Sequence, residues 1–269
     1  HENGWVRDTA QRMIVETNNQ GVVGSLKKLL ANGKTAQSRL HALWTLEGIH
    51  SLDHKTLETA SKDTSSKVRA AVVNLATEAT WQHAFLPDAA GKTKEGPIAG
   101  LVGDKSPDVQ LALAFQLGTK SKFEARPLLN QLLRANPTPA IAQGVLSGMQ
   151  GQELDYLEEL VKLPITDSRW LQNSGIIKML AGMVQSERKP ASMNKALDLA
   201  ASLKANSPVQ IALLEGLSGK SSDPRKNQST TQAKPIQLAA EPAALLQLTS
   251  KANANLSPVL ALINQQLNW

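Results

Sequence analysis

A helical pattern of apolar and polar positions recurs along the chain. The clearest copy runs from Val68 to Ala76, and segments 109–118 and 209–217 repeat it closely. The copies mostly begin about 30 to 34 residues apart, with one interval of about 40, and such a period is typical of solenoids built from helix pairs. We therefore expect helix pairs that bury their apolar faces against neighbouring pairs. Weaker copies begin near Val6, Ser38, Ile141 and Asn173.

In the first copy, Val6, Ala10, Met13 and Ile14 share one stripe of a helix. Sustained alternation with period two is absent from the sequence, so strands are not expected. The pattern predicts an all-α fold, a right-handed α-solenoid of about seven helix pairs. The predicted helix pairs are 5–15 with 22–30, 36–48 with 53–61, 141–149 with 154–161, and 170–184 with 191–203. A third copy begins at 63–69 and is followed by a less regular return segment and a helical stretch from 96 to 102, and a fourth begins at 104–108 with its partner over 123–133. Further helices are predicted over 209–217, 241–248 and 257–267.

Local signals mark several helix ends. Asp53 is placed to cap the helix that follows it by accepting a free backbone N–H. Asn32-Gly33 closes the helix over 22–30, and we expect Gly33 in the left-handed conformation that glycine adopts easily at a C-terminal cap. Residues 220–234 hold almost no apolar side chains and predict a flexible loop.

The repeats extend over the whole chain, so residues 1–269 are predicted to form a single repeat domain. Segment 235–269 is expected to supply terminal capping helices. The chain begins in the middle of a helical motif, which indicates a piece of a longer protein. It contains no run of eighteen apolar residues and no pattern of a secretory leader.

The composition excludes some chemistry and leaves one alternative open. Cysteine is absent, which excludes disulfides, Cys-ligated zinc and haem attached through C-x-x-C-H. The formal net charge of +6 and the pI near 9.5 are compatible with a nucleic-acid partner. The basic residues are scattered, however, with local density only over 220–234, and this favours a solvated basic surface over nucleic-acid binding.

Two kinds of motif resemble known families. Asp63 stands six residues before Arg69 in an Ala-rich helix, which resembles HEAT repeats, where such Asp and Arg side chains link neighbouring units. The fourth copy keeps Asp104 but has Gln110 in the place of the Arg, and other copies lack the Asp, so a partial ladder is expected. Segments 1–16 and 38–48 resemble, more specifically, the HEAT-like region of large bacterial membrane-bound dehydrogenase-type proteins.

The second resemblance implies a context for the chain. In that family the region follows a β-propeller similar to quinone-dependent sugar or sorbosone dehydrogenases, and it commonly precedes a c-type cytochrome domain. The resemblance therefore implies a periplasmic or exported scaffold whose partners are those two domains or another protein. Neither domain is part of this sequence, so no cofactor and no redox chemistry are expected in these residues.

Motifs for catalysis are not evident. His50 and His54 are four residues apart, but Ser51–Asp53 reads as a turn and a cap, which spoils the alignment that a shared metal would need. Glu158 and Glu159 are adjacent on a helix and point apart. Gly-x-Ser-x-Gly and H-E-x-x-H are absent from the sequence. We expect no catalytic, cofactor or metal site in this chain, so a dehydrogenase activity of the segment itself is disfavoured.

The first two copies carry the candidates for an interdomain interface, since Trp and Arg are enriched at binding hot spots. An alternative is that the Trp residues only cover repeat edges, the Arg residues bind helix carbonyls, and His41 has a hydrogen-bonded packing role. The function predicted is a non-catalytic scaffold for protein–protein or interdomain contacts, and the alternative is a basic nucleic-acid-binding module. The candidate interface residues are Trp5, Arg7, Arg12, Arg39, His41 and Trp44.

Overall fold

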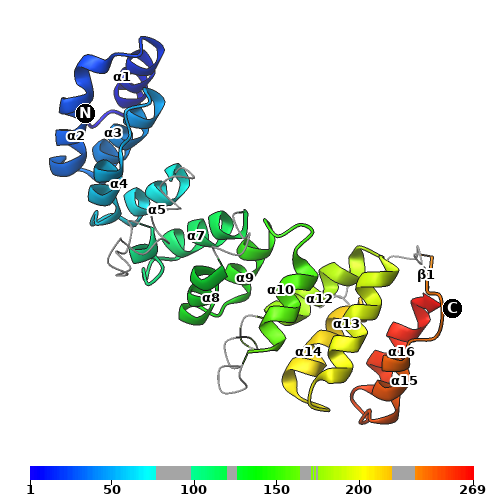
Figure 1. Cartoon of the computed structure of the whole chain (residues 1–269). Helices are drawn as coiled ribbons and strands as arrows, with labels where there is room; N and C mark the ends of the chain where they lie inside the picture. The colour runs from blue at the N-terminus through cyan, green and yellow to red at the C-terminus, as the bar shows by residue number, and fades with distance from the viewer. Residues whose placement is uncertain (77–97, 120–125, 164–170, 172, 174, 220–233) are drawn as a thin grey trace, which may run out of the picture. The chain divides into compact units, whose positions relative to one another are not determined.

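The structure, a computed structural model, describes residues 1–76, 98–119, 126–163, 171, 173, 175–219 and 234–269. These residues are predominantly helical, which confirms the predicted all-α class (Figure 1). The chain was predicted to form one continuous domain, and its contacts divide into two compact units, His1–Ala135 and Asn136–Trp269. We call these the N-terminal unit and the C-terminal unit.

The helices of the N-terminal unit begin close to the predicted positions. Thr35 and Asp53 cap α3 and α4 with their side chains, which accept hydrogen bonds from the backbone N–H groups of Ser38 and Thr56, so the predicted cap at Asp53 is confirmed. The elements are α1 (Gly4–Glu16), the 3₁₀ helix η1 (Gln20–Val22), α2 (Val23–Asn32), α3 (Ala36–Gly48), α4 (His54–Ser61), α5 (Ser66–Leu75), the 3₁₀ helix η2 (Ala99–Leu101), α7 (Pro107–Thr119) and α8 (Arg126–Ala135).

The helices of the N-terminal unit pack in two layers. In one layer α1 contacts α3, α3 contacts α5 and α5 contacts α7, and we call this the ladder layer. The helices α2 and α4 contact each other in the second layer, where α2 packs mainly against α3 and α4 against α5. The predicted pairing of 5–15 with 22–30 is therefore wrong, because the principal partner of α2 is the helix that follows it.

Gly33 ends α2 in a different way from the one predicted. Its φ of −60° and ψ of 130° are extended rather than left-handed. Its N–H donates to the carbonyl of Leu29 at 2.8 Å. A β-carbon at this position would lie 2.6 Å from that same carbonyl oxygen, so the glycine is required by close backbone approach.

The C-terminal unit is also built of two series of helices. In one series α12 contacts α9 and α14, and α14 contacts α16; in the other α13 contacts α10 and α15. The core includes fully buried Tyr156, Met149 and Leu213. The elements are α9 (Pro139–Leu146), α10 (Glu153–Val161), α12 (Ile176–Ser186), α13 (Pro190–Ser202), α14 (Pro208–Leu217), β1 (Ile236–Gln237), α15 (Ala243–Ser250), α16 (Ser257–Gln265) and β2 (Leu267–Asn268).

The last part of the chain contains a small sheet as well as the expected helices. The strands β1 and β2 pair in parallel, with Ile236 opposite Leu267 and Gln237 opposite Asn268. The prediction that strands are absent is therefore wrong at this place, since a two-residue strand is too short to show a period. The predicted loop over 220–234 lies outside the described residues, apart from Lys234.

None of the helices that the structure describes combines the length and the apolar character that a membrane-spanning helix requires.

Candidate interaction surfaces

Arg39 links two helices of the ladder layer. Its Nε and Nη2 donate to the two carboxylate oxygens of Asp63 at 2.6 and 2.8 Å, in the bidentate geometry that suits a guanidinium. Its Nη1 donates to the carbonyl oxygen of Gly33, six residues before it, at 2.8 Å. Asp63 precedes α5, so this side chain of α3 connects α3 to the next helix of the layer.

Arg69 repeats this arrangement one step further along. Its Nε and Nη2 donate to Asp104 at 2.6 and 3.1 Å, and its Nη1 donates to the carbonyl oxygen of Asp63, again six residues earlier, at 2.7 Å. The side chain of Asp104 is only 9% exposed. The two arginines and two aspartates form an Arg–Asp ladder through α3, α5 and the approach to α7.

The ladder shifts the protonation equilibria of its members. The hydrogen bond from Arg69 lowers the pKa of Asp104 below its ordinary value, against the opposing effect of burial. For Asp63, burial raises the pKa, but the hydrogen bonds from Arg39 and from the N–H of Ser65 outweigh it, so the pKa is again lowered. Both carboxyl groups are therefore held in their charged form at neutral pH.

The ladder is incomplete at both ends, as the sequence predicted. Arg39 and Arg69 each bind one Asp side chain and at least one backbone carbonyl oxygen. Arg7 makes only the carbonyl contacts, since its Nη1 donates to the carbonyl oxygens of His1 and Glu2 at 2.6 and 2.8 Å. Gly33 stands where Asp63 and Asp104 stand in the later steps. The Nε of Arg7 is buried and has no hydrogen-bond partner within the described part of the chain. At the other end, the side chain of Gln110 donates to the carbonyl oxygen of Asp104 at 2.7 Å.

His41 joins α3 to α1. Its Nδ1 lies 2.7 Å from Oε1 of Gln11, and its Nε2 lies 3.7 Å from a carboxylate oxygen of Asp8. Farther along the same contact, a β-carbon at Gly48 would lie 2.7 Å from the side chain of Val15, so the helices approach closely there. The hydrogen-bonded packing role that we considered for His41 is thus confirmed.

The remaining candidates are on the surface. Trp5 is 72% exposed at the start of α1, and Trp44 is 37% exposed on α3. Arg12 is exposed and lies 3.7 Å from Glu16, one turn away on the same helix. The six predicted residues therefore separate into three that act within the fold, namely Arg7, Arg39 and His41, and three that are available to a partner, namely Trp5, Arg12 and Trp44.

The helix that carries Trp5 is less buried than its counterparts. Arg7, Arg39, Arg69 and Gln110 occupy the same place in α1, α3, α5 and α7, since each donates to the carbonyl six residues earlier. In each of these helices, the residues one position before, three after and seven after the donor lie on the same stripe of the helix surface. This stripe is Val68 and Val72 in α5 with Ala76 directly after it, Val109, Leu113 and Leu117 in α7, and Ser38, Ala42 and Leu46 in α3.

The stripe is covered in the later helices and uncovered in α1. All six residues of the stripe at α5 and α7 are buried, as are Ala42 and Leu46 in α3. The stripe of α1 is Val6, Ala10 and Ile14, of which Ala10 is exposed and the other two are half-buried. No residue of α1 is buried, and Met13 beside the stripe is 58% exposed. An apolar helix face is therefore presented at the N-terminal end of the unit.

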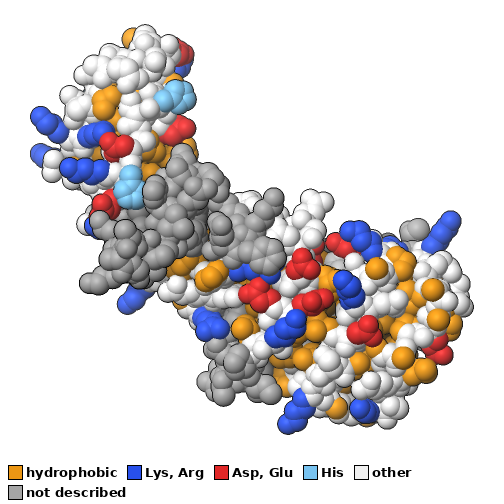
Figure 2. All heavy atoms as spheres, viewed as in Figure 1, with side chains coloured by type: hydrophobic (Ala, Val, Ile, Leu, Met, Phe, Trp, Pro, Cys, Tyr) orange, Lys and Arg blue, Asp and Glu red, His pale blue; other side chains and the backbone are white. Residues whose placement is uncertain are grey.

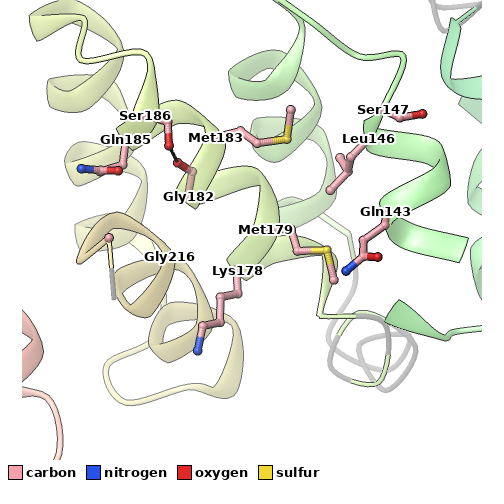
Figure 3. Close-up of a pocket in the computed structure, with 11 residues that line it drawn as sticks. Gln143, Leu146, Ser147, Lys178, Met179, Gly182, Met183, Gln185, Ser186 and Gly216 are labelled. Atoms are coloured by element: carbon pink, nitrogen blue, oxygen red, sulfur yellow. Dashed lines mark hydrogen bonds between the residues drawn. The ribbon is translucent and has the colours of Figure 1, made fainter. Parts of the chain in front are cut away.

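The C-terminal unit has a different surface feature, an open groove of about 540 Å³. In Figure 3, Met179 and Met183 of α12 lie on the side toward α9, and Leu146 of α9 points toward them. Ser147 and Ser186 at its edge donate to carbonyl oxygens of their own helices, those of Gly144 and Gly182, each at 2.7 Å. The groove therefore presents methionine and leucine side chains together with the polar side chains of Gln143, Lys178 and Gln185.

Glycines bring α12 and α14 together beside this groove. A β-carbon at Gly216 would lie 2.3 Å from the carbonyl oxygen of Lys178 and 2.6 Å from the β-carbon of Ala181, so the backbones are in direct contact. At Gly182 the nearest atom to an added β-carbon would be 3.8 Å away, which is ordinary packing distance. Lys178 and Glu215 close one edge of the contact with an ion pair of 2.8 Å.

The two histidines considered for a shared metal, His50 and His54, lie on separate elements. His50 follows α3 in the left-handed conformation, with a φ of 55°, and His54 begins α4, so they do not share a helix, as predicted. Within the described residues, no group of three or more His, Asp or Glu side chains is placed to hold a metal ion.

Sequence reasoning missed two features of these surfaces. It recognised Asp63 and Arg69 as a motif but did not see that Arg39 pairs with Asp63. The order of an Arg followed by an Asp was a usable signal, because Arg69 and Asp104 repeat it, although 24 residues separate the first pair and 35 the second. It also gave no weight to Gly216 inside an apolar helix, although an interior glycine often marks a close backbone approach.

Comparisons of the chain with models of protein families, with curated proteins and with solved structures gave no match.

Proposed function

We propose that the chain is a non-catalytic scaffold that mediates protein–protein or interdomain contacts, and that the exposed edge of α1 is its docking surface. The observation that carries this proposal is the uncovered apolar stripe of α1 together with the 72% exposed Trp5. Apolar surface of this kind, edged by polar residues, is typical of interaction sites. Arg12 and Glu16 supply the polar edge on the same helix.

The proposed architecture is a right-handed α-solenoid of HEAT-like repeats. The Arg–Asp ladder supports it, because each step joins one helix of the layer to the approach of the next. In such an array each unit contacts only its neighbours, and the resulting surface is semi-rigid and can hold a partner in a fixed geometry. The function would be geometric and would need no chemistry from these residues.

The proposed setting is an exported bacterial protein of the dehydrogenase and cytochrome type. It rests on the resemblance of segments 1–16 and 38–48, which include Trp5 and the ladder residue Arg39. In this setting the partner would be a β-propeller domain, a c-type cytochrome domain or a separate protein, and the location would be periplasmic.

Site-specific photo-crosslinking in the cells that make the protein tests the docking surface. A photoreactive residue at position 5 should give one discrete crosslink, either to an adjoining domain of the same polypeptide or to a separate protein, whereas the same residue at the exposed position of Thr59 on α4 should not. Mass spectrometry of the adduct identifies the partner, and peptides of a β-propeller would support the proposed setting. Equal labelling at both positions, or none at position 5, would contradict the proposal.

The nucleic-acid alternative has less support. Arg39 and Arg69 are engaged in the ladder, and Lys67 pairs with Asp108 at 3.1 Å. Figure 2 shows Lys and Arg side chains interspersed with Asp and Glu over the visible face. We expect no DNA binding above that of a control protein in anisotropy measurements at about 50 mM salt, where phosphate contacts are strongest.

A further inference from the structure

The open groove of the C-terminal unit has a floor that is nearly free of side chains. Gly182 and Ser186 lie one turn apart along the middle of the part of α12 that lines it, and Met179 and Met183 form the wall toward α9 (Figure 3). The hydroxyl of Ser186 is turned back to the carbonyl oxygen of Gly182 at 2.7 Å. The groove, of about 540 Å³, therefore exposes the helix backbone between its walls.

Packing within the fold does not explain the glycine at position 182. A β-carbon there would lie 3.8 Å from its nearest neighbour, whereas one at Gly216 would lie 2.3 Å from a backbone oxygen. Glycine in the interior of a helix lowers its stability relative to alanine. Gly182 therefore weakens α12 without being needed for the contact with α14, and the space that it leaves free belongs to the groove.

The charges around the groove restrict what it can bind. In α9, α12 and α14, which carry most of its lining, the only charged residues are Lys178 and Glu215, and they pair with each other at 2.8 Å. A charged ligand would lose its hydration without gaining an unpaired opposite charge from these helices. An uncharged apolar ligand, in contrast, matches the methionine and leucine side chains of the walls.

We propose that this groove binds an extended, uncharged segment of a partner polypeptide, with a large apolar side chain packed between Leu146 and the methionines Met179 and Met183. This contact lies on the C-terminal unit and does not depend on the docking edge of α1. The crosslink at position 5 and the titration described below therefore succeed or fail separately.

The shape and the rim of the groove favour an extended segment. A site for a small molecule encloses most of its ligand, whereas this groove is open and suits a chain that continues beyond it. Gln143 at the rim is exposed, and its side chain makes no hydrogen bond within the described residues, so its carboxamide is free to donate to and accept from the main chain of the segment. The lining of α12 runs from Lys178 to Ser186, about 12 Å, which about four extended residues cover.

A second copy of the chain does not fit the groove in this way. In a two-fold dimer one face meets the same face of the other copy, so a protruding apolar side chain is needed next to the groove. Among the described residues of the C-terminal unit, the large apolar side chains that are exposed are Leu246 and Trp269. Neither belongs to α9, α12 or α14, so the groove lacks a counterpart on its own face.

Methyl NMR of residues 1–269 tests the proposal. The chain has five methionines, so methyl labelling gives separate reporters, with Met179 and Met183 in the groove and the exposed Met13 on the other unit. The probe is the capped peptide acetyl-Gly-Leu-Gly-Leu-amide, and the same peptide with Lys or with Asp in place of Leu is the control. We expect the leucine peptide alone to shift the two groove signals saturably, with a Kd of about 1 mM, and to leave Met13 unchanged.

The variant Gly182→Ala separates binding from folding. Its methyl group occupies the floor where the segment lies, so the leucine peptide should bind at least about fivefold more weakly, while the urea midpoint does not fall. Gly24→Ala is the matched control, since an added β-carbon at this exposed position of α2 meets no atom within 4 Å, and the Kd should stay the same.

Three results would overturn the proposal. The first is equal affinity of the leucine peptide for the two alanine variants, and the second is an equal response to all three peptides or to none of them at about 10 mM, ten times the expected Kd. The third is a pair of groove signals that move with protein concentration in the absence of peptide, which would identify a second copy as the occupant.

Discussion

The two units differ in the main device that holds their helices together, although Gly48 in the first and the Lys178–Glu215 ion pair in the second are examples of the other device. In the N-terminal unit, charged side chains cross from one helix to the next, and the Arg39–Asp63 and Arg69–Asp104 pairs are the repeated device. In the C-terminal unit, α12 and α14 meet through glycine, with Gly216 against the backbone of Lys178. Close packing of neighbouring helices can therefore be fixed either by directional Arg–Asp hydrogen bonds or by a glycine, whose lack of a side chain lets two backbones touch.

The largest expected effect comes from breaking the ladder at Arg69. The change Arg69→Met leaves Asp104 buried without its partner and frees two carbonyl contacts, and it should lower the free energy of unfolding by about 3 kcal/mol. Urea titration followed by circular dichroism measures it. The matched change Arg12→Met removes only an exposed ion pair of 3.7 Å and should cost less than about 0.5 kcal/mol. An equal loss of unfolding free energy in the two variants would show that the ladder stabilises the fold no more than an exposed ion pair does.

The next effect tests the glycine contact of the C-terminal unit. The change Gly216→Ala forces a β-carbon into the backbone of α12 and should cost about 2 kcal/mol by overpacking. Gly182→Ala places its β-carbon 3.8 Å from the nearest atom, so the better helix propensity of Ala should raise stability by about 0.5 kcal/mol. Stabilisation by both changes would contradict the close backbone approach between Gly216 and α12.

A smaller effect should appear on acidification. The pKa of Asp63 and of Asp104 is lowered in the folded state, so their contribution to stability is complete above the unfolded value of about 4. It is lost as the pH falls through the lower folded values. Stability measured between about pH 5 and pH 2 should therefore fall less steeply for Asp104→Asn than for the unchanged chain, and parallel curves would contradict this account.

The smallest effects separate two roles of Asp53. The Lys27 hydrogen bond and the hydrogen bonds of Thr56 lower the pKa of Asp53 to about 2. As a cap of α4 it should contribute about 1 kcal/mol, which Asp53→Ala removes. The ion pair with Lys27 is exposed, so Lys27→Met should cost less than about 0.5 kcal/mol. A larger loss from Lys27→Met than from Asp53→Ala would mean that the ion pair, rather than the cap, stabilises this turn.

Much of the fold could be predicted from local signals, and its assembly could not. The helix ends at Asp53 and Thr35 follow from side chains that bind neighbouring backbone groups, which is a property of a few adjacent residues. The partner of α2 depends on which of two similar apolar faces it covers, and the period alone is the same for either choice. The strands at 236–237 and 267–268 arise from two segments that meet only in the folded chain.

The candidate interface residues also separate into those that residue type predicts and those whose role depends on the assembled fold. Trp5 and Arg12 were named from residue type, and their exposure agrees with an interface. Arg7 and Arg39 were named for the same reason but bind within the fold. Arg7 donates to backbone carbonyl oxygens directly before α1, and Arg39 donates to Gly33 and Asp63. Residue type identified the helix, and only the register of α1 against α3, α5 and α7 identified its uncovered face.

The measurement that tests the central claim most directly is residue-resolved hydrogen exchange of residues 1–269. If the stripe of α1 lacks cover, the amides of α1 should exchange at least about 100-fold faster than those of α3, because α1 can open without unfolding its neighbours. Equal protection of α1 and α3 would contradict the claim, since it would mean that the first helix is already fully packed in the isolated chain.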